Sequence, residues 1–302
     1  MTSLTEFFIP AKEAQLRARL IKPPIPRLSA DGAVGVFLLC HGMMANIDGP
    51  VFVWFQNLLA QKFSIASVAF DFHGNGKSTG STSYGNYYEE ADDICAVVKF
   101  INGCKVPSIS ATTKVIGILG HSKGASSMFL FGFKYAHLCP PLLIALSARF
   151  WLAREITMRW TEENRQALKS NGKFLWRTYG KNPNKKNGSG NNNSTEQGCV
   201  KEYWISAKEL AERSATDMAV VQSLPMHRCF VFSATGACDQ IVPDDDVWEY
   251  HRLIRLASPN SGRIATHIVP GASHFWTKQS EVDSLEQVLL PWLSKFFPRV
   301  KL

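Results

Sequence analysis

Short apolar runs alternate with longer segments of mixed polarity along most of the chain. The runs lie at residues 34–40, 64–70, 114–119, 141–146, 228–233 and 263–269. Their apolar residues are nearly continuous rather than alternating, which is typical of parallel strands covered by helices on both faces. The pattern therefore predicts six buried strands of one wound sheet.

The segments between these runs have the length and spacing of helices. Helices are expected at residues 51–62, 87–102, 125–136, 244–256 and 282–297. Strands that alternate with helices predict an α/β fold with a mostly parallel central sheet flanked by helices. The alternating stretch within residues 6–22 predicts an additional antiparallel hairpin at one edge of the sheet.

This alternation is interrupted between residues 149 and 223. Two aromatic-rich, helix-like segments flank residues 181–198, which contain almost no apolar side chains to offset the entropy of ordering them. We therefore predict a core built from residues 1–148 and 224–302, and a helical insertion at 149–223 that carries a disordered loop at 181–198.

A candidate nucleophile lies in the stretch GILGHSKGASS. Residues 120–124 match the pattern Gly-x-Ser-x-Gly between a predicted strand and a predicted helix, which is the context that this motif requires. The turn is so tight that a side chain at Gly120 or Gly124 would collide with neighbouring backbone. Ser122 is then the exposed serine, whereas Ser126 falls inside the helix and is interpreted as a packing or surface residue.

A serine hydroxyl needs a base within hydrogen-bond reach, and the base needs a third group to orient it. His121 adjoins Ser122, but the sharp turn directs the two side chains apart, so we interpret His121 as structural. His274 follows the last predicted strand and Asp239 follows the strand before it. The carboxyl ends of parallel strands form the ligand-binding edge of such sheets, so Ser122, Asp239 and His274 are expected to meet there as a catalytic triad.

Each of these assignments has an alternative. A Gly-x-Ser-x-Gly match often arises by chance, and a histidine in a loop is usually polar surface. Asp244, Asp245 and Asp246 also follow the strand, but they come directly after Pro243 and are interpreted as first-turn residues of a helix. Agreement among three residues in chain order and in strand-end position favours the triad.

Residues 68–80, VAFDFHGNGKSTG, contain a second glycine-rich pattern, Asp-x-x-Gly-x-Gly-x-Ser, from Asp71 to Ser78. The pattern matches neither of the two phosphate-binding loop motifs that contain such glycines. We therefore interpret it as a structural turn that follows a strand.

The combination of His41-Gly42, the Asp71 to Ser78 pattern, the Gly-His-Ser-Lys-Gly turn and the two later loops resembles the α/β-hydrolase superfamily. Within it, the chain is similar to serine hydrolases with a cap, in the monoacylglycerol lipase-like and feruloyl esterase-like group. The resemblance covers roughly residues 6–150 and 224–298, and the insertion stands where that family carries its cap.

The resemblance implies a serine hydrolase that cleaves carboxylic esters through an acyl-enzyme, with Ser122, Asp239 and His274 as its triad. It implies no metal and no organic cofactor. The same residues could serve an acyltransferase, a thioesterase or an amidase. A non-catalytic binding protein on a hydrolase scaffold is the alternative from a different class.

An oxyanion hole is also expected, because this fold uses two backbone amides for it. The amide of Lys123 follows the nucleophile and is one expected donor, and the side chain of Lys123 is expected to be free to vary. The amide of Met43, after the strand at 34–40, is the other. The Met43 and Met44 side chains could line an acyl pocket or fill the core.

Aromatic residues of the insertion leave two interpretations of the substrate site open. They could form an apolar pocket for an acyl or aromatic group, or they could pack against the core. The residues concerned are Phe150, Trp151, Trp160, Phe174, Trp176 and Trp204. The expected partner is a small-molecule ester with an apolar acyl or aromatic part.

Composition narrows the class of protein. With 302 residues, 45% hydrophobic and 19% charged, the chain is expected to be a soluble globular protein, and no apolar run reaches the roughly 20 residues that span a bilayer. The net charge of +8 is spread along the chain without a nucleic-acid-binding motif, so no nucleic-acid partner is expected. Seven dispersed cysteines without metal-ligand spacing indicate reduced thiols. The oligomeric state is left open.

The N-terminus lacks the basic and apolar regions of a secretory signal, which favours a cytoplasmic location. The C-terminal tripeptide Val300-Lys301-Leu302 is similar to a peroxisomal address, with valine where a small residue is expected. A peroxisomal location is therefore the alternative.

Overall fold

The chain divides into two compact units in a computed structural model. The model describes residues 2–29, 31–154, 160–179, 201–259 and 262–298. The larger unit comprises Met1–Thr82, Asn86–Leu152 and Thr216–Leu302, and the smaller unit comprises Ser83–Gly85 and Ala153–Ala215. The loop predicted at 181–198 and the C-terminal tripeptide lie outside the described residues.

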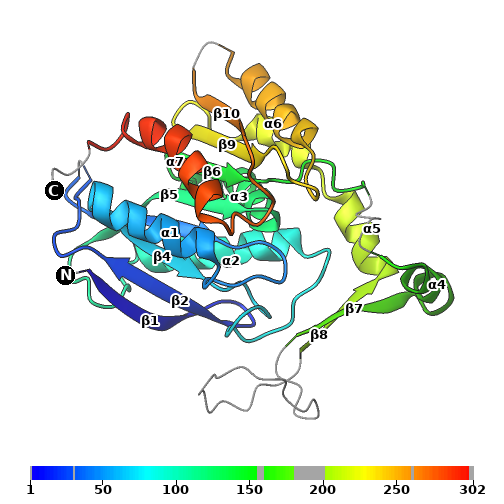
Figure 1. Cartoon of the computed structure of the whole chain (residues 1–302). Helices are drawn as coiled ribbons and strands as arrows, with labels where there is room; N and C mark the ends of the chain where they lie inside the picture. Colours follow the sequence, from blue (N-terminus) through cyan, green and yellow to red (C-terminus); the bar gives the residue numbers. More distant parts are fainter. Residues whose placement is uncertain (1, 30, 155–159, 180–200, 260–261, 299–302) are drawn as a thin grey trace. The chain divides into compact units, whose positions relative to one another are not determined.

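An eight-stranded sheet organises the described part of the larger unit (Figure 1). Its strands lie in the order β1 (Ser3–Pro10), β2 (Gln15–Lys22), β4 (Ala66–Phe70), β3 (Val34–Cys40), β5 (Thr113–His121), β6 (Leu142–Leu146), β9 (Phe230–Gly236) and β10 (Ile264–Val269). The six strands from β4 to β10 are parallel, whereas β1 and β2 are antiparallel. The mostly parallel sheet and the edge hairpin are therefore confirmed.

Helices cover both faces of this sheet. One face packs against α1 (Pro50–Leu58), which continues into a π-helical turn η1 (Leu59–Phe63), and against α7 (Gln279–Leu293). The other face packs against α2 (Tyr87–Asn102), α3 (Lys123–Lys134) and α6 (Asp244–Ala257). Short 3-10 helices stand at η2 (Ala136–Leu138) and η4 (Met218–Ser223).

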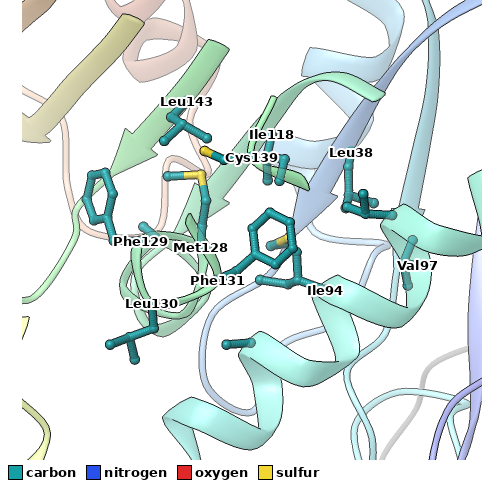
Figure 2. Close-up of a cluster of buried hydrophobic side chains, with 14 of the residues drawn as sticks. Leu38, Ile94, Val97, Ile118, Met128, Phe129, Leu130, Phe131, Cys139 and Leu143 are labelled. Atoms are coloured by element: carbon teal, nitrogen blue, oxygen red, sulfur yellow. The ribbon is translucent and has the colours of Figure 1, made fainter. Parts of the chain in front are cut away.

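The α2 and α3 face of the sheet shows why these segments are helical. In α2, Ile94, Val97 and Ile101 recur at helical spacing, and all three are fully buried. Figure 2 shows Ile94 and Val97 near Phe131 of α3 and near Leu38 of β3. Burial of each side chain of this size stabilises the fold by roughly 1.5–3 kcal/mol. The packing therefore holds α2 and α3 firmly against the sheet.

The smaller unit differs from the helical insertion that the sequence predicts. Its helices α4 (Glu162–Asn171) and α5 (Ala207–Ala215) are present, but an antiparallel pair of strands, β7 (Lys173–Tyr179) and β8 (Lys201–Ser206), lies between them. Phe174 is buried and Leu175 is exposed, as expected when the side chains of a strand alternate between two faces.

Aromatic side chains form the packed centre of the smaller unit. The ring of Trp160 lies 5.2 Å from that of Phe174, and the ring of Trp176 lies 6.1 Å from Tyr84 and 6.0 Å from Tyr203. These contacts favour the packing interpretation for Trp160, Phe174 and Trp176.

Phe150 and Trp151 belong to the larger unit, and Phe150 packs 5.0 Å from the ring of Tyr250 in α6. Trp151 and Trp204 are each partly exposed. Among the described residues, no helix is both long and apolar enough to cross a membrane.

Candidate active site

Ser122 alone joins β5 to α3. Its backbone has φ 53° and ψ −121°, outside the regions that non-glycine residues ordinarily adopt. A Cβ added to Gly124 would lie 2.2 Å from the carbonyl oxygen of His41, and one added to Gly120 would lie 2.5 Å from Cα of Ala125. Both positions therefore require glycine, as predicted, and the close packing holds Ser122 in its strained conformation.

Three of the predicted residues meet at the carboxyl ends of β5, β9 and β10. His274 Nε2 lies 3.1 Å from Ser122 Oγ, and His274 Nδ1 lies 2.8 Å from Asp239 Oδ2. His274 is 5% exposed and the Asp239 side chain is 1% exposed. The serine hydroxyl can donate to an imidazole nitrogen whose opposite N–H donates to a carboxylate.

Asp239 is held by backbone donors as well as by His274. Its Oδ1 accepts from the N–H groups of Ile241 and Val242, each at 2.8 Å. Burial by itself would raise the pKa of Asp239, but the hydrogen bond and charge of His274 and the two backbone donors outweigh burial and lower this pKa. The carboxylate therefore stays ionised and fixes the proton of His274 on Nδ1, which leaves Nε2 to accept from Ser122.

His121 contacts the backbone of His274 rather than taking the proton of Ser122. Its Nε2 donates to the carbonyl oxygen of His274 at 2.8 Å, and the ring is buried beneath the turn. Burial first, and repulsion from the His274 imidazole second, lower the pKa of His121 to about 3. His121 is therefore a neutral donor that ties the His274 loop to the Ser122 turn.

This pKa predicts how stability depends on pH. In an unfolded chain the pKa of a histidine is about 6.5, so the neutral burial of His121 stabilises fully above that pH, and its contribution is lost as the pH falls towards 3. The loss between pH 7 and pH 5 is about 2 kcal/mol at about 1.4 kcal/mol per pH unit. His121→Gln keeps a donor for the His274 carbonyl and should remove this part of the pH dependence in urea unfolding.

The matched control is His137→Gln, because His137 is exposed on η2. This variant should lose as much stability between pH 7 and pH 5 as the parent protein does. An equally steep loss in His121→Gln would mean that His121 is not buried in its neutral form.

The loop after β3 lies directly against the turn. Cys40 pairs with Gly120 in the sheet, and a Cβ on Gly42 would lie 3.1 Å from Cβ of Ser122. His41 holds the loop, because its Nδ1 donates to the Gly42 carbonyl at 2.7 Å and its Nε2 accepts from a backbone N–H of Phe72 at 3.0 Å. The structure therefore places the predicted donor Met43 in the loop that adjoins Ser122.

The glycine-rich loop after β4 supports the loop after β3. Asp71 is fully buried, its Oδ1 accepts from the Ile47 N–H at 2.8 Å, and its Oδ2 accepts from the Lys77 N–H at 3.0 Å. A Cβ on Gly76 would lie 2.1 Å from the Asp71 carboxylate. These contacts agree with the structural interpretation, since the side chain of Asp71 is used entirely inside the protein.

Asp246 has a larger role than a first-turn residue of α6. It is fully buried, and its Oδ1 accepts from the N–H groups of Phe150 and Trp151 at 2.7 Å each. Arg149 donates to the carbonyl of Ile241 at 2.8 Å, so these residues hold the Asp239 loop beside β6. No motif in the sequence indicates either contact.

The expectation that the side chain of Lys123 is free to vary is wrong. Lys123 is 3% exposed, and its Nζ lies 2.8 Å from Oε1 of Glu90, which is equally buried. The charged end of Lys123 therefore lies inside the protein against α2. A residue at position 123 that cannot donate to Glu90 would leave this buried carboxylate without its counter-charge.

Within the part of the chain that the structure describes, no group of three or more His, Cys, Asp or Glu side chains is arranged to hold a metal ion. The sulfur atoms of Cys139 and Cys229 lie 3.6 Å apart as thiols.

Solved structures similar to the whole chain come from several organisms. An esterase, Pf2001, from Pyrococcus furiosus is 17% identical with a TM-score of 0.64, and the match covers 97% of this chain and 93% of that one. Est1E from Butyrivibrio proteoclasticus, with ferulic acid bound, is 16% identical with a TM-score of 0.61 over 95% and 99% of the two chains. An α/β serine hydrolase homologue from Coxiella burnetii is 17% identical with a TM-score of 0.58 over 97% and 98%.

The chain has the α/β-hydrolase fold. No protein-family model and no curated protein matches the sequence. The likeness therefore lies in the three-dimensional arrangement, and it confirms the predicted fold class. In this α/β-hydrolase fold, Ser122 stands on the turn after β5, with the ends of β9 and β10 on the far side of β6.

Proposed function

We propose that the protein is a serine hydrolase that cleaves carboxylic esters through an acyl-enzyme. The observation that carries this proposal is the hydrogen-bonded series from Ser122 Oγ to His274 to Asp239, on a strained turn beside the loop after β3. The presence of esterases and a serine hydrolase homologue among similar folds supports it.

In the proposed reaction, Ser122 Oγ attacks the ester carbonyl carbon while His274 Nε2 takes its proton. The backbone N–H groups of Lys123 and Met43 hold the negatively charged carbonyl oxygen of the tetrahedral intermediate. His274 then gives the proton to the leaving alcohol as its bond to carbon breaks. In the second half, His274 takes a proton from water as the water oxygen attacks the acyl carbon. It gives the proton to Ser122 Oγ as the acyl–serine bond breaks, which releases the acid.

Asp239 supplies the orientation that both halves of the reaction need. Its carboxylate keeps the proton on Nδ1 of His274 and stabilises the imidazolium that forms after the proton is taken from Ser122. The lowered pKa of Asp239 supports this role, because the carboxylate is ionised throughout the neutral pH range.

A fluorophosphonate serine probe tests the nucleophile. We expect the wild-type protein to be labelled and Ser122→Ala to be unlabelled. Ser126→Ala is the matched control, because Ser126 is buried in α3 and donates to the Arg149 carbonyl at 3.0 Å; it should label as wild type does. Labelling that persists in folded Ser122→Ala would refute the assignment.

The acyl group is tested with p-nitrophenyl esters from acetate to decanoate. We propose a small ester with an apolar acyl or aromatic part, and the bound ferulic acid of Est1E is an aromatic acid of this kind. Turnover across the series should pass through an optimum set by the depth of the acyl site. If no ester is turned over and no probe reacts, the proposed activity is wrong and a non-catalytic binding protein is favoured.

A further inference from the structure

Lys123 is the first residue of α3, and its charged end is buried beside the Ser122 turn. Its Nζ lies 2.8 Å from Glu90 Oε1, donates to Asn86 Oδ1, and lies 5.0 Å from the centre of the Tyr87 ring. Asn86, Tyr87 and Glu90 all belong to the first turns of α2 or immediately precede it. Burial of an ammonium group is costly unless it is paired. Here the ammonium contacts a carboxylate, an amide oxygen and an aromatic ring at the start of α2.

Both polar groups that receive Lys123 are themselves held in place. Glu90 Oε2 accepts from Ser127 Oγ at 2.8 Å. Asn86 donates its amide to His73 Nε2 at 2.8 Å, and His73 Nδ1 donates to Asp93 at 2.5 Å. Because the ammonium of Lys123 can only donate, Asn86 points its carbonyl at Lys123 and its amide N–H at His73.

The backbone of Lys123 lies at the reacting centre of the proposed hydrolase. Its N–H is a proposed oxyanion donor, and it directly follows Ser122, whose φ of 53° must be maintained by surrounding contacts. Close packing at Gly120 and Gly124 holds that conformation, but neither glycine has a side chain that reaches a neighbouring helix. The Lys123 side chain is the part of the turn that reaches across to α2.

We propose that the Lys123–Glu90 ion pair, with Asn86 as the second acceptor of the ammonium, is a positioning device that holds the oxyanion amide and Ser122 in register through α2. The proposal rests on the proposed function. A buried ion pair stabilises a fold no better than a well-packed apolar pair, so stability does not explain a lysine here. A charged pair with fixed hydrogen bonds does constrain direction, and misplacement of a reacting group by about 1 Å can lower the rate about 10²-fold.

The test removes both charges together. Lys123→Met or Glu90→Gln alone leaves one buried charge unpaired and should lower the melting temperature by about 5–15 °C. The double variant Lys123→Met/Glu90→Gln removes both charges and keeps an acceptor for Ser127, so its melting temperature should return to within about 3 °C of wild type. Its kcat for p-nitrophenyl esters should still fall about 10- to 100-fold, with KM changed less than about 3-fold.

A second measurement separates positioning from general damage. Alkyl trifluoromethyl ketones form a tetrahedral adduct with the serine, and their affinity should fall by the same factor as kcat/KM in the double variant. The matched control is Lys134→Met/Asp92→Asn, which removes the other ion pair between α3 and α2, a partly exposed pair at 2.6 Å. It should keep wild-type kcat.

Asn86→Ala covers the case in which the double variant does not fold. It removes one receiver of Lys123 and leaves the ion pair intact, so kcat should fall about 3- to 10-fold at unchanged KM. Wild-type kcat in folded Lys123→Met/Glu90→Gln or in Asn86→Ala would overturn the proposal, as would an equal loss in the Lys134 control. Inactive wild-type protein that no fluorophosphonate labels would instead refute the proposed hydrolase.

Discussion

His274→Ala is expected to lower kcat for p-nitrophenyl esters at least about 10⁴-fold, with KM changed only a few-fold. The reason is that His274 Nε2, which lies 3.1 Å from Ser122 Oγ, is the proposed base, and alanine leaves the hydroxyl without an acceptor for its proton. Steady-state hydrolysis and the rate of fluorophosphonate labelling measure the loss, and both rates should fall together.

The matched comparison is His121→Gln, which changes the other histidine at this turn. His121 contacts the His274 carbonyl and keeps that contact as glutamine, so kcat should fall less than about 10-fold. A folded His121→Gln protein as inactive as His274→Ala would contradict the assignment of the base. Circular dichroism melts establish that both variants are folded.

The positions of these residues could be predicted because they depend on strand ends. Each parallel strand is marked by a nearly continuous apolar run, and a residue that follows such a run must lie at one edge of the sheet. Ser122, Asp239 and His274 each follow a run, and the structure brings their side chains within hydrogen-bond distance. The apolar runs do not reveal the register of β5 with β3 and β6. The edge of the sheet at which each strand ends can be predicted without that register.

The surroundings of the Ser122 turn were less predictable. Glu90 occupies the same face of α2 as Ile94, Val97 and Ile101, at the spacing of a buried helical stripe. A carboxylate on that stripe indicates a buried partner, but the sequence does not say which cation meets it. Lys123 is 33 positions later, and only the packing of α2 on α3 brings the two together.

The strands of the smaller unit were missed for a related reason. Phe174 and Trp176 alternate with exposed residues, as a strand requires, but the run is short and its apolar residues also fit one face of a helix. β7 is a strand because β8 supplies its hydrogen bonds, and β8 begins only at Lys201. Pairing over that separation is a tertiary effect that local propensity does not contain.

Asp239→Asn is expected to lower kcat about 10⁴-fold while the fold is retained. The Ile241 and Val242 N–H groups require an oxygen at Oδ1, so the new amide nitrogen must stand where Oδ2 now accepts from His274. An N–H at that place cannot accept from Nδ1, and the imidazole must shift its proton to Nε2. Nε2 then faces Ser122 Oγ as a donor and cannot take its proton.

Asp244→Asn is the control for this substitution, because Asp244 is an exposed first-turn residue of α6 that lies five positions later. Its kcat should stay within about 2-fold of wild type, as is usual for surface changes. The tautomer in Asp239→Asn is measured directly from the imidazole nitrogen shifts of ¹⁵N-labelled protein. If Asp239→Asn keeps more than about a tenth of wild-type kcat and the proton stays on Nδ1, Asp239 does not set the tautomer. The stated loss of kcat together with a proton on Nε2 would establish that it does.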